Sequence, residues 1–189
     1  MRWTRSLLHR LGGGLLLGAL AVSSAWADQN SPRLDALFGQ LHVARSSFEA
    51  GMLEQMIWEV WIEHEDPQVQ RQMRSAADFM SAQEYGSALA LLDTVVEQVP
   101  DYAEGWNRRA TVRFLAADYK GSVEDIDRTL ALEPRHFGAL SGLGQIRMIQ
   151  QRPEEALEAF ERALEVNPHM RSVRTIRDRL KLGLQQQAI

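Results

Sequence analysis

Three prolines recur in this chain at intervals of 34 residues, at Pro100, Pro134 and Pro168. Small residues recur at the same interval, Ala88, Ser122 and Ala156 at one offset and Ala76, Ala110 and Gly144 at another. A fixed period of this length is typical of stacked supersecondary units that bury their apolar faces only against one another. The sequence therefore predicts a repeat array, a class of fold that more often offers a binding surface than a catalytic centre.

Apolar residues from Leu34 onward follow helical spacing, and strand alternation is absent. We therefore expect an all-α fold. The three prolines stop the second helix of each unit, because proline lacks the backbone N–H that a helix interior needs. The predicted segments are a helical pair at 34–67, which is either a degenerate repeat or an N-terminal cap, repeat units at 69–102, 103–136 and 137–170 (69–168 counted to the last proline), and a polar capping helix with a tail at 170–189.

The units resemble tetratricopeptide repeats. The second unit carries Trp106, Ala110, Tyr119 and Pro134 at positions 4, 8, 17 and 32 of the family's 34-residue pattern. The resemblance implies a short right-handed solenoid of helix-turn-helix units, like those of small secreted bacterial members of the family. Arginines depart from the pattern at Arg109, where leucine is common, and at Arg113, where an aromatic residue is usual.

The first 27 residues read as a secretory signal. Arg2, Arg5 and Arg10 precede an apolar run over 11–22, and Ala25-Trp26-Ala27 follows it. We expect cleavage after Ala27, a short tether over 28–33 and a periplasmic protein. The alternative is an uncleaved membrane anchor, but a run of 12 residues is short for a span that needs roughly 20.

Composition excludes several classes of site and partner. The chain has no cysteine, which rules out disulfides, thiolate metal sites and a lipidated cysteine. Cleavage would remove three arginines and no acid, which changes the net charge from −4 to −7. An acidic protein has no general attraction to nucleic acid or anionic lipid, so we expect no nucleic-acid partner and no membrane association after cleavage.

No catalytic residue, metal ligand set or cofactor site is indicated. The histidines fall in different units without ligand spacing, and His136, at an inter-unit turn, is interpreted as structural. Gly142 and Gly144 are interpreted as sites of close helix packing, since no strand precedes them as a phosphate loop requires. Asp125 and Asp127 are interpreted as surface charges.

Two local patterns predict how particular side chains are used, one in packing and one in capping a helix. Trp58 and Trp61 share a helix face and are expected to pack the N-terminal pair onto the first repeat unit. Asp101 and Glu104 have the spacing of a capping box for the helix that follows.

The resemblance also implies a concave groove lined by the first helix of each unit. The residues placed there are Met73, Arg74, Met80, Asn107, Arg108, Thr111, Phe114, Gln145 and Met148. This mixture suits an extended or helical peptide, because methionine adapts to irregular surfaces and arginine can hold a carboxylate. The lysine and asparagine of the family's chaperone-tail clamp are replaced by Met73 and Ala77, so that partner is not expected.

The sequence therefore predicts a non-enzymatic periplasmic module that binds a protein or peptide, with an envelope assembly as one setting. Two alternatives stay open. One is a structural protein that self-associates through Trp58, Trp61 and the open ends of the array. The other, less favoured, is a small-ligand protein or an enzyme. The partner, the oligomeric state and whether the N-terminal helices cover the groove are left open.

Overall fold

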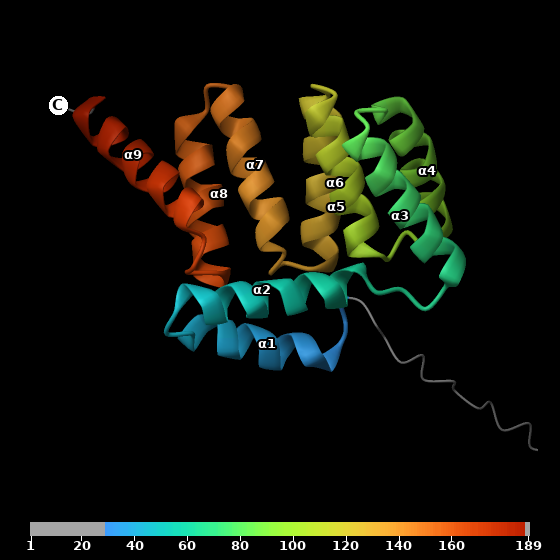
Figure 1. The fold of residues 1–189 in the computed structure, drawn as a ribbon. Coiled ribbons are helices and arrows are strands. Elements are labelled where there is room, and N and C mark those ends of the chain that lie inside the picture. The colour runs from blue at the N-terminus through green and yellow to red at the C-terminus, as the bar shows by residue number, and fades with distance from the viewer. Residues whose placement is uncertain (1–28, 188–189) are drawn as a thin grey trace, which may run out of the picture.

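The computed structural model describes residues 29–187, which form nine α-helices and no strand (Figure 1). The predicted signal peptide lies outside these residues. The helices are α1 (Pro32–Val43), α2 (Ser47–Ile62), α3 (Pro67–Ser81), α4 (Tyr85–Gln98), α5 (Ala103–Leu115), α6 (Tyr119–Leu132), α7 (Phe137–Ile149), α8 (Pro153–Val166) and α9 (Arg171–Gln187). The prediction of an all-α, right-handed repeat solenoid is confirmed, with α3/α4, α5/α6 and α7/α8 as its units.

The turn inside each unit has the same backbone geometry. Gln83, Ala117 and Gln151 lie 34 residues apart and have φ angles of 60°, 61° and 57°. These are left-handed conformations, which glycine adopts more easily than other residues. Each turn is closed by an N–H that donates to a carbonyl five residues earlier, at 2.8 to 2.9 Å, as in a Schellman motif. The left-handed conformation of these turns could not be predicted from the sequence, because none of them contains glycine.

Close helix packing explains the small residues of the repeat. A Cβ placed on Gly144 would lie 2.5 Å from the ring of Phe160 in α8. Ala88 and Ala156 have no exposed surface at all. The packing interpretation is therefore confirmed for Gly144, where the ring of Phe160 fills the space that the missing side chain leaves. It was wrong for Gly142, where a Cβ would make only an ordinary contact with Ile126 at 3.7 Å.

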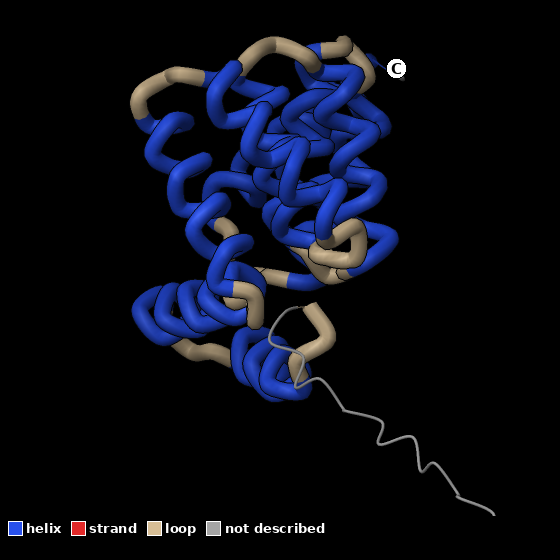
Figure 2. The backbone as a smooth tube through the Cα atoms, turned by 90° about the vertical axis from the view of Figure 1, so that its right-hand side faces the viewer, coloured by secondary structure: helices blue, strands red, loops and turns tan. Residues whose placement is uncertain are grey.

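Helices α1 and α2 do not continue the stack. They lie crosswise along one end of the other helices, and Figures 1 and 2 show them below the row of repeat units. We call this pair the brace. The expectation that its tryptophans pack on the first unit was wrong, because Trp61 stacks on His136 with ring centroids 4.1 Å apart. Trp58 meets Phe137 edge to face, in a space that Gly138 leaves open.

The brace is bonded to all three turns that follow the second helices of the units. The three polar links are Tyr102 Oη donating to the carbonyl of Ile62 at 2.9 Å, Arg135 paired with Asp35 at 2.7 Å, and Asn167 Nδ2 donating to Glu54 at 2.8 Å. The brace thus spans the whole array and is bonded to each of its units.

The predicted capping box at the start of α5 was wrong. Gln29, just before α1, supplies the cap instead, since its Oε1 accepts from the N–H of Ala103 and its Nε2 donates to the carbonyl of Asp101. Glu104 is freed from that role and turns into the interior, where 2% of its surface is exposed. The partner lies 74 residues away in the sequence, which a local motif cannot reveal.

Candidate binding groove

Three neighbouring pockets follow the first helices of the units. The central pocket, about 270 Å³, lies between α5, α6 and α7. The C-terminal pocket, about 580 Å³, lies between α7, α8 and α9, and shares Phe114 and Gln145 with the central one. The N-terminal pocket, about 390 Å³, lies between α2, α3 and α5. Volumes of this size fall in or near the range of about 300–1,000 Å³ that suits ligand sites.

The pockets differ in chemistry along this path. The central pocket mixes amides and hydroxyls with apolar groups, and its lining is Asn107, Ala110, Thr111, Phe114, Leu115, Ser122, Ile126, Gly138, Ala139, Gly142, Gln145 and Ile146. The C-terminal pocket is almost wholly apolar, and its lining is Phe114, Gln145, Met148, Ile149, Pro153, Phe160, Ile176, Arg179, Leu180, Gly183 and Leu184. The N-terminal pocket carries charges of both signs around Ile62, Met73 and Ala77. We call the three pockets together the groove.

Most of the residues predicted from sequence meet in the groove. Asn107, Thr111, Phe114, Gln145 and Met148 line the central or C-terminal pocket. Met148 and Thr111 are exposed, whereas Asn107 is buried against Glu104.

The residues predicted for the first unit are placed less uniformly. Met73, Arg74 and Arg108 line the N-terminal pocket, but only 2% of Met73 is exposed. Met80 is half-buried and packs into the core of the first unit, and it lines none of the three pockets. Arg74 is therefore the exposed cation at this end of the groove.

Arg108 is held by a buried acid. Its guanidinium pairs with Glu104 at 2.8 Å, and Glu104 also accepts from His136 Nε2 at 3.2 Å. His136 Nδ1 accepts from the N–H of Ala139, so the ring proton is on Nε2. Burial raises the pKa of Glu104, but the hydrogen bond from His136 and the charge of Arg108 outweigh it and hold that pKa below its ordinary value. Arg108 is thus already neutralised, unlike the free cation expected from sequence.

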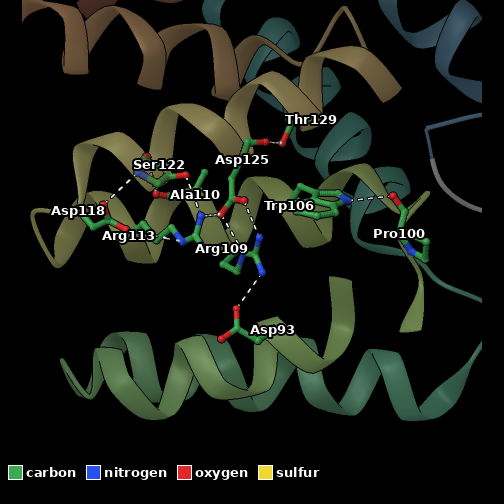
Figure 3. A network of polar contacts seen from close by, with 11 residues as sticks. Asp93, Pro100, Trp106, Arg109, Ala110, Arg113, Asp118, Ser122, Asp125 and Thr129 are labelled. Carbon is green, nitrogen blue, oxygen red and sulfur yellow. Dashed lines mark hydrogen bonds and ion pairs between the residues drawn. The ribbon is translucent and has the colours of Figure 1, made fainter. Parts of the chain in front are cut away.

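A second polar cluster joins α4, α5 and α6 (Figure 3). Arg109 holds Asp125 with two hydrogen bonds at 2.7 and 2.9 Å and reaches Asp93 at 2.8 Å. Arg113 pairs with Asp125 at 3.1 Å. The interpretation of Asp125 as a surface charge was wrong, because 1% of it is exposed. Arg109 and Arg113, which depart from the repeat pattern, need this buried carboxylate as their partner. Their presence in the sequence was therefore the signal that could have predicted a buried Asp125.

The structure also adds residues that sequence reasoning missed. Ile176, Leu180 and Leu184 of α9 form one wall of the C-terminal pocket. From the sequence α9 was interpreted as a polar cap, although Ile176 and Leu180 stand four residues apart and so share one side of the helix. Within residues 29–187 there is no cluster of three histidine, aspartate or glutamate side chains that would hold a metal ion. None of the helices there has the length and apolar character needed to cross a bilayer.

The sequence is similar to those of known repeat proteins. The tetratricopeptide repeat family profile matches residues 138–170. A TPR repeat-containing protein from Rhizobium etli is 38% identical over 136 residues, which cover 72% of this chain and 67% of the relative. The chain belongs to the tetratricopeptide repeat (TPR) family. TPR domains typically act as modules of protein–protein interaction and not as enzymes.

More distant TPR proteins share part of the chain or the fold alone. Small glutamine-rich tetratricopeptide repeat-containing protein 2 of Saccharomyces cerevisiae is 28% identical over 87 residues, 46% of this chain, which spans 25% of that protein. The solved structure of the first TPR of Spaghetti (RPAP3) bound to an HSP90 peptide aligns with a TM-score of 0.60 and 21% identity. That alignment covers 64% of this chain and 96% of the other.

Proposed function

We propose that this TPR protein is a non-enzymatic periplasmic adaptor whose groove holds a peptide segment of a protein partner within an envelope assembly. The observation that carries the proposal is the run of pockets along α3, α5 and α7, two of which are continuous through Phe114 and Gln145. A continuous depression suits an elongated ligand. The peptide bound to the related RPAP3 domain supports the same class of ligand.

The brace supports this proposal by keeping the groove open. Its helices lie across the ends of the repeat units, and only Glu59 and Ile62 of α2, with the adjoining Glu63, reach the N-terminal pocket. The remaining lining comes from the repeat units and α9. A partner would therefore meet a preformed surface and pay little to organise it.

A site-specific crosslinking experiment tests the proposal. A photo-crosslinking residue is placed at Gln145 in the groove, and in a matched protein at Glu158, which is exposed on α8 and lines none of the three pockets. We expect a partner to be captured in cells at Gln145 but not at Glu158. Thr111→Arg, which fills the central pocket from an exposed position, should abolish capture with folding intact by circular dichroism.

Two results would refute this function. Equal capture at Gln145 and Glu158 would show that the groove does not select the partner. Capture that persists with Thr111→Arg would place the contact elsewhere. In either case a peptide derived from the captured protein would also fail to compete with that protein for the groove.

Self-association has an observation of its own. Trp61 is buried, which removes it from the contact expected from sequence, but Phe48, Met52 and Met56 form an exposed apolar row on α2. Molecular mass measured over a concentration series tests this second candidate. Dimers that are lost with Met52→Glu would favour it, and a monomer at all concentrations would exclude it.

A further inference from the structure

The C-terminal pocket differs from the rest of the groove because a helix outside the repeats completes it. Helix α9 packs on α8 through Val173, which is 4% exposed. Farther along, Ile176, Leu180 and Leu184 are partly exposed and line the pocket. The apolar side of α9 thus forms one wall of an open pocket of about 580 Å³ that the described side chains leave unfilled.

Charge is also concentrated on α9. Residues 171–187 contain five basic residues and one acid, a net charge of +4. The expected mature chain has a net charge of −7, so the rest of it carries −7 minus 4, or −11. Among the described residues, Arg179 at the edge of the C-terminal pocket has no ion pair or hydrogen bond. A free guanidinium beside an apolar pocket is suited to a carboxylate that flanks an apolar anchor.

We propose that α9 makes the C-terminal pocket an anchor site for an acidic amphipathic helix of the partner. This inference rests on the groove function proposed above and specifies the partner's chemistry at one end of it. Adjacent apolar side chains on one face of a helix would fill the pocket, and acidic residues on the flanks would meet Arg179 and the basic side of α9. The rest of the protein is acidic and repels acidic segments in general. Only a segment that also places apolar side chains in the pocket would offset this repulsion, which adds selectivity.

A basic amphipathic helix can also signal binding to a membrane surface. The geometry favours the peptide, because the apolar residues of α9 face α7 and α8 across a concave pocket and a flat bilayer cannot enter it. Leu182, which is 60% exposed, lies outside the pocket lining. Membrane binding is therefore an outcome that the test must separate.

The test uses the complete mature chain and a designed, fluorescein-labelled helical peptide with leucines along one face and glutamates elsewhere. Two control peptides replace the glutamates by lysines or the leucines by serines. Fluorescence anisotropy should show that the first peptide binds at least about tenfold more tightly than either control. Equal binding of the lysine peptide, or no binding of the glutamate peptide, would overturn the inferred chemistry of the partner.

Matched variants of α9 locate the site. Arg179→Glu should weaken binding about tenfold, whereas Arg171→Glu, the same change away from the pocket, should weaken it less than about threefold. Leu184→Ser should weaken binding about tenfold, and Leu182→Ser should leave it unchanged. Equal effects within each pair would overturn the assignment to this pocket.

Two further arms separate the remaining explanations. Loss of binding with Thr111→Arg but not with the α9 variants would preserve groove binding and overturn only the α9 anchor. Vesicles of anionic phosphatidylglycerol are mixed with the protein in a sedimentation assay. Sedimentation that is lost with Arg179→Glu and Leu184→Ser would assign the helix to a membrane and also overturn the inference.

Discussion

Two glycines of α7 provide a sharp test of how closely the helices of the third unit approach. A Cβ on Gly142 would find only Ile126 Cδ1 at 3.7 Å, an ordinary contact. A Cβ on Gly144 would lie 2.5 Å from the Phe160 ring, and that ring has no exposed surface through which to move away. Gly142→Ala and Gly144→Ala are therefore the same chemical change, two residues apart, in different surroundings.

The expected energies follow from this difference. In a helix interior either alanine gains about 1 kcal/mol over glycine from backbone entropy. Overpacking at Gly144 costs about 1–3 kcal/mol. The helix gain is common to both variants and cancels, so Gly144→Ala should be less stable than Gly142→Ala by about 1–3 kcal/mol. For a chain of this size the melting temperatures should differ by about 2–12 °C.

Urea denaturation followed by circular dichroism at 222 nm measures both variants. The urea dependence of the unfolding free energy should stay constant, so that midpoints report stability directly. The clash should shrink when Gly144→Ala is combined with Phe160→Leu, and a double-mutant cycle isolates that coupling. Equal stabilisation by both glycine substitutions would refute the close approach of α7 and α8.

Three further predictions concern charge and processing. Asp125→Ala should lower the free energy of unfolding by about 3 kcal/mol because it removes the buried carboxylate that two half-buried arginines share, whereas Asp127→Ala on the exposed side should change it by less than about 0.5 kcal/mol. Urea denaturation measures both, and equal effects would contradict the buried cluster. Because the pKa of Glu104 is lowered, its ionised form stabilises the fold above its ordinary value of 4.5, and that stability is lost as the pH falls through the lower value in the fold. Glu104→Gln should therefore flatten the decline of the urea midpoint below pH 4.5, and an unchanged decline would argue against the buried pair. Mass spectrometry of the mature protein should find Asp28 as its first residue, and an intact N-terminus would refute cleavage.

Local patterns predicted the repeats well, because the features that define them lie within one unit. Proline stops, small residues at the helix crossings and apolar spacing each depend on neighbours in sequence. The pairing of Asp125 with Arg109 was within reach of the same reasoning, since arginines at core positions need a buried acid. It was missed because Asp125 stands beside other charged residues that are exposed.

The position of the brace could not be predicted in this way. It depends on single contacts between distant residues, such as Gln29 with Ala103 and Glu54 with Asn167, and neither contact leaves a periodic trace. The α9 wall of the C-terminal pocket could be predicted only in part. The spacing of the apolar residues of α9 is visible in the sequence. Whether that apolar face is covered by other side chains or left open depends on the angle at which the helix leaves α8.

The brace changes the order in which this chain can fold. A stack whose units touch only their neighbours can begin folding anywhere and extend one unit at a time. Here the carbonyl of Leu41 bonds to His169, 128 residues later. At about 5–20 residues per second, synthesis of that interval takes roughly 6–25 s, during which α1 lacks this contact with the turn that follows α8. Contacts of such long separation slow folding, so the last unit to be made determines when the first helices reach their final place.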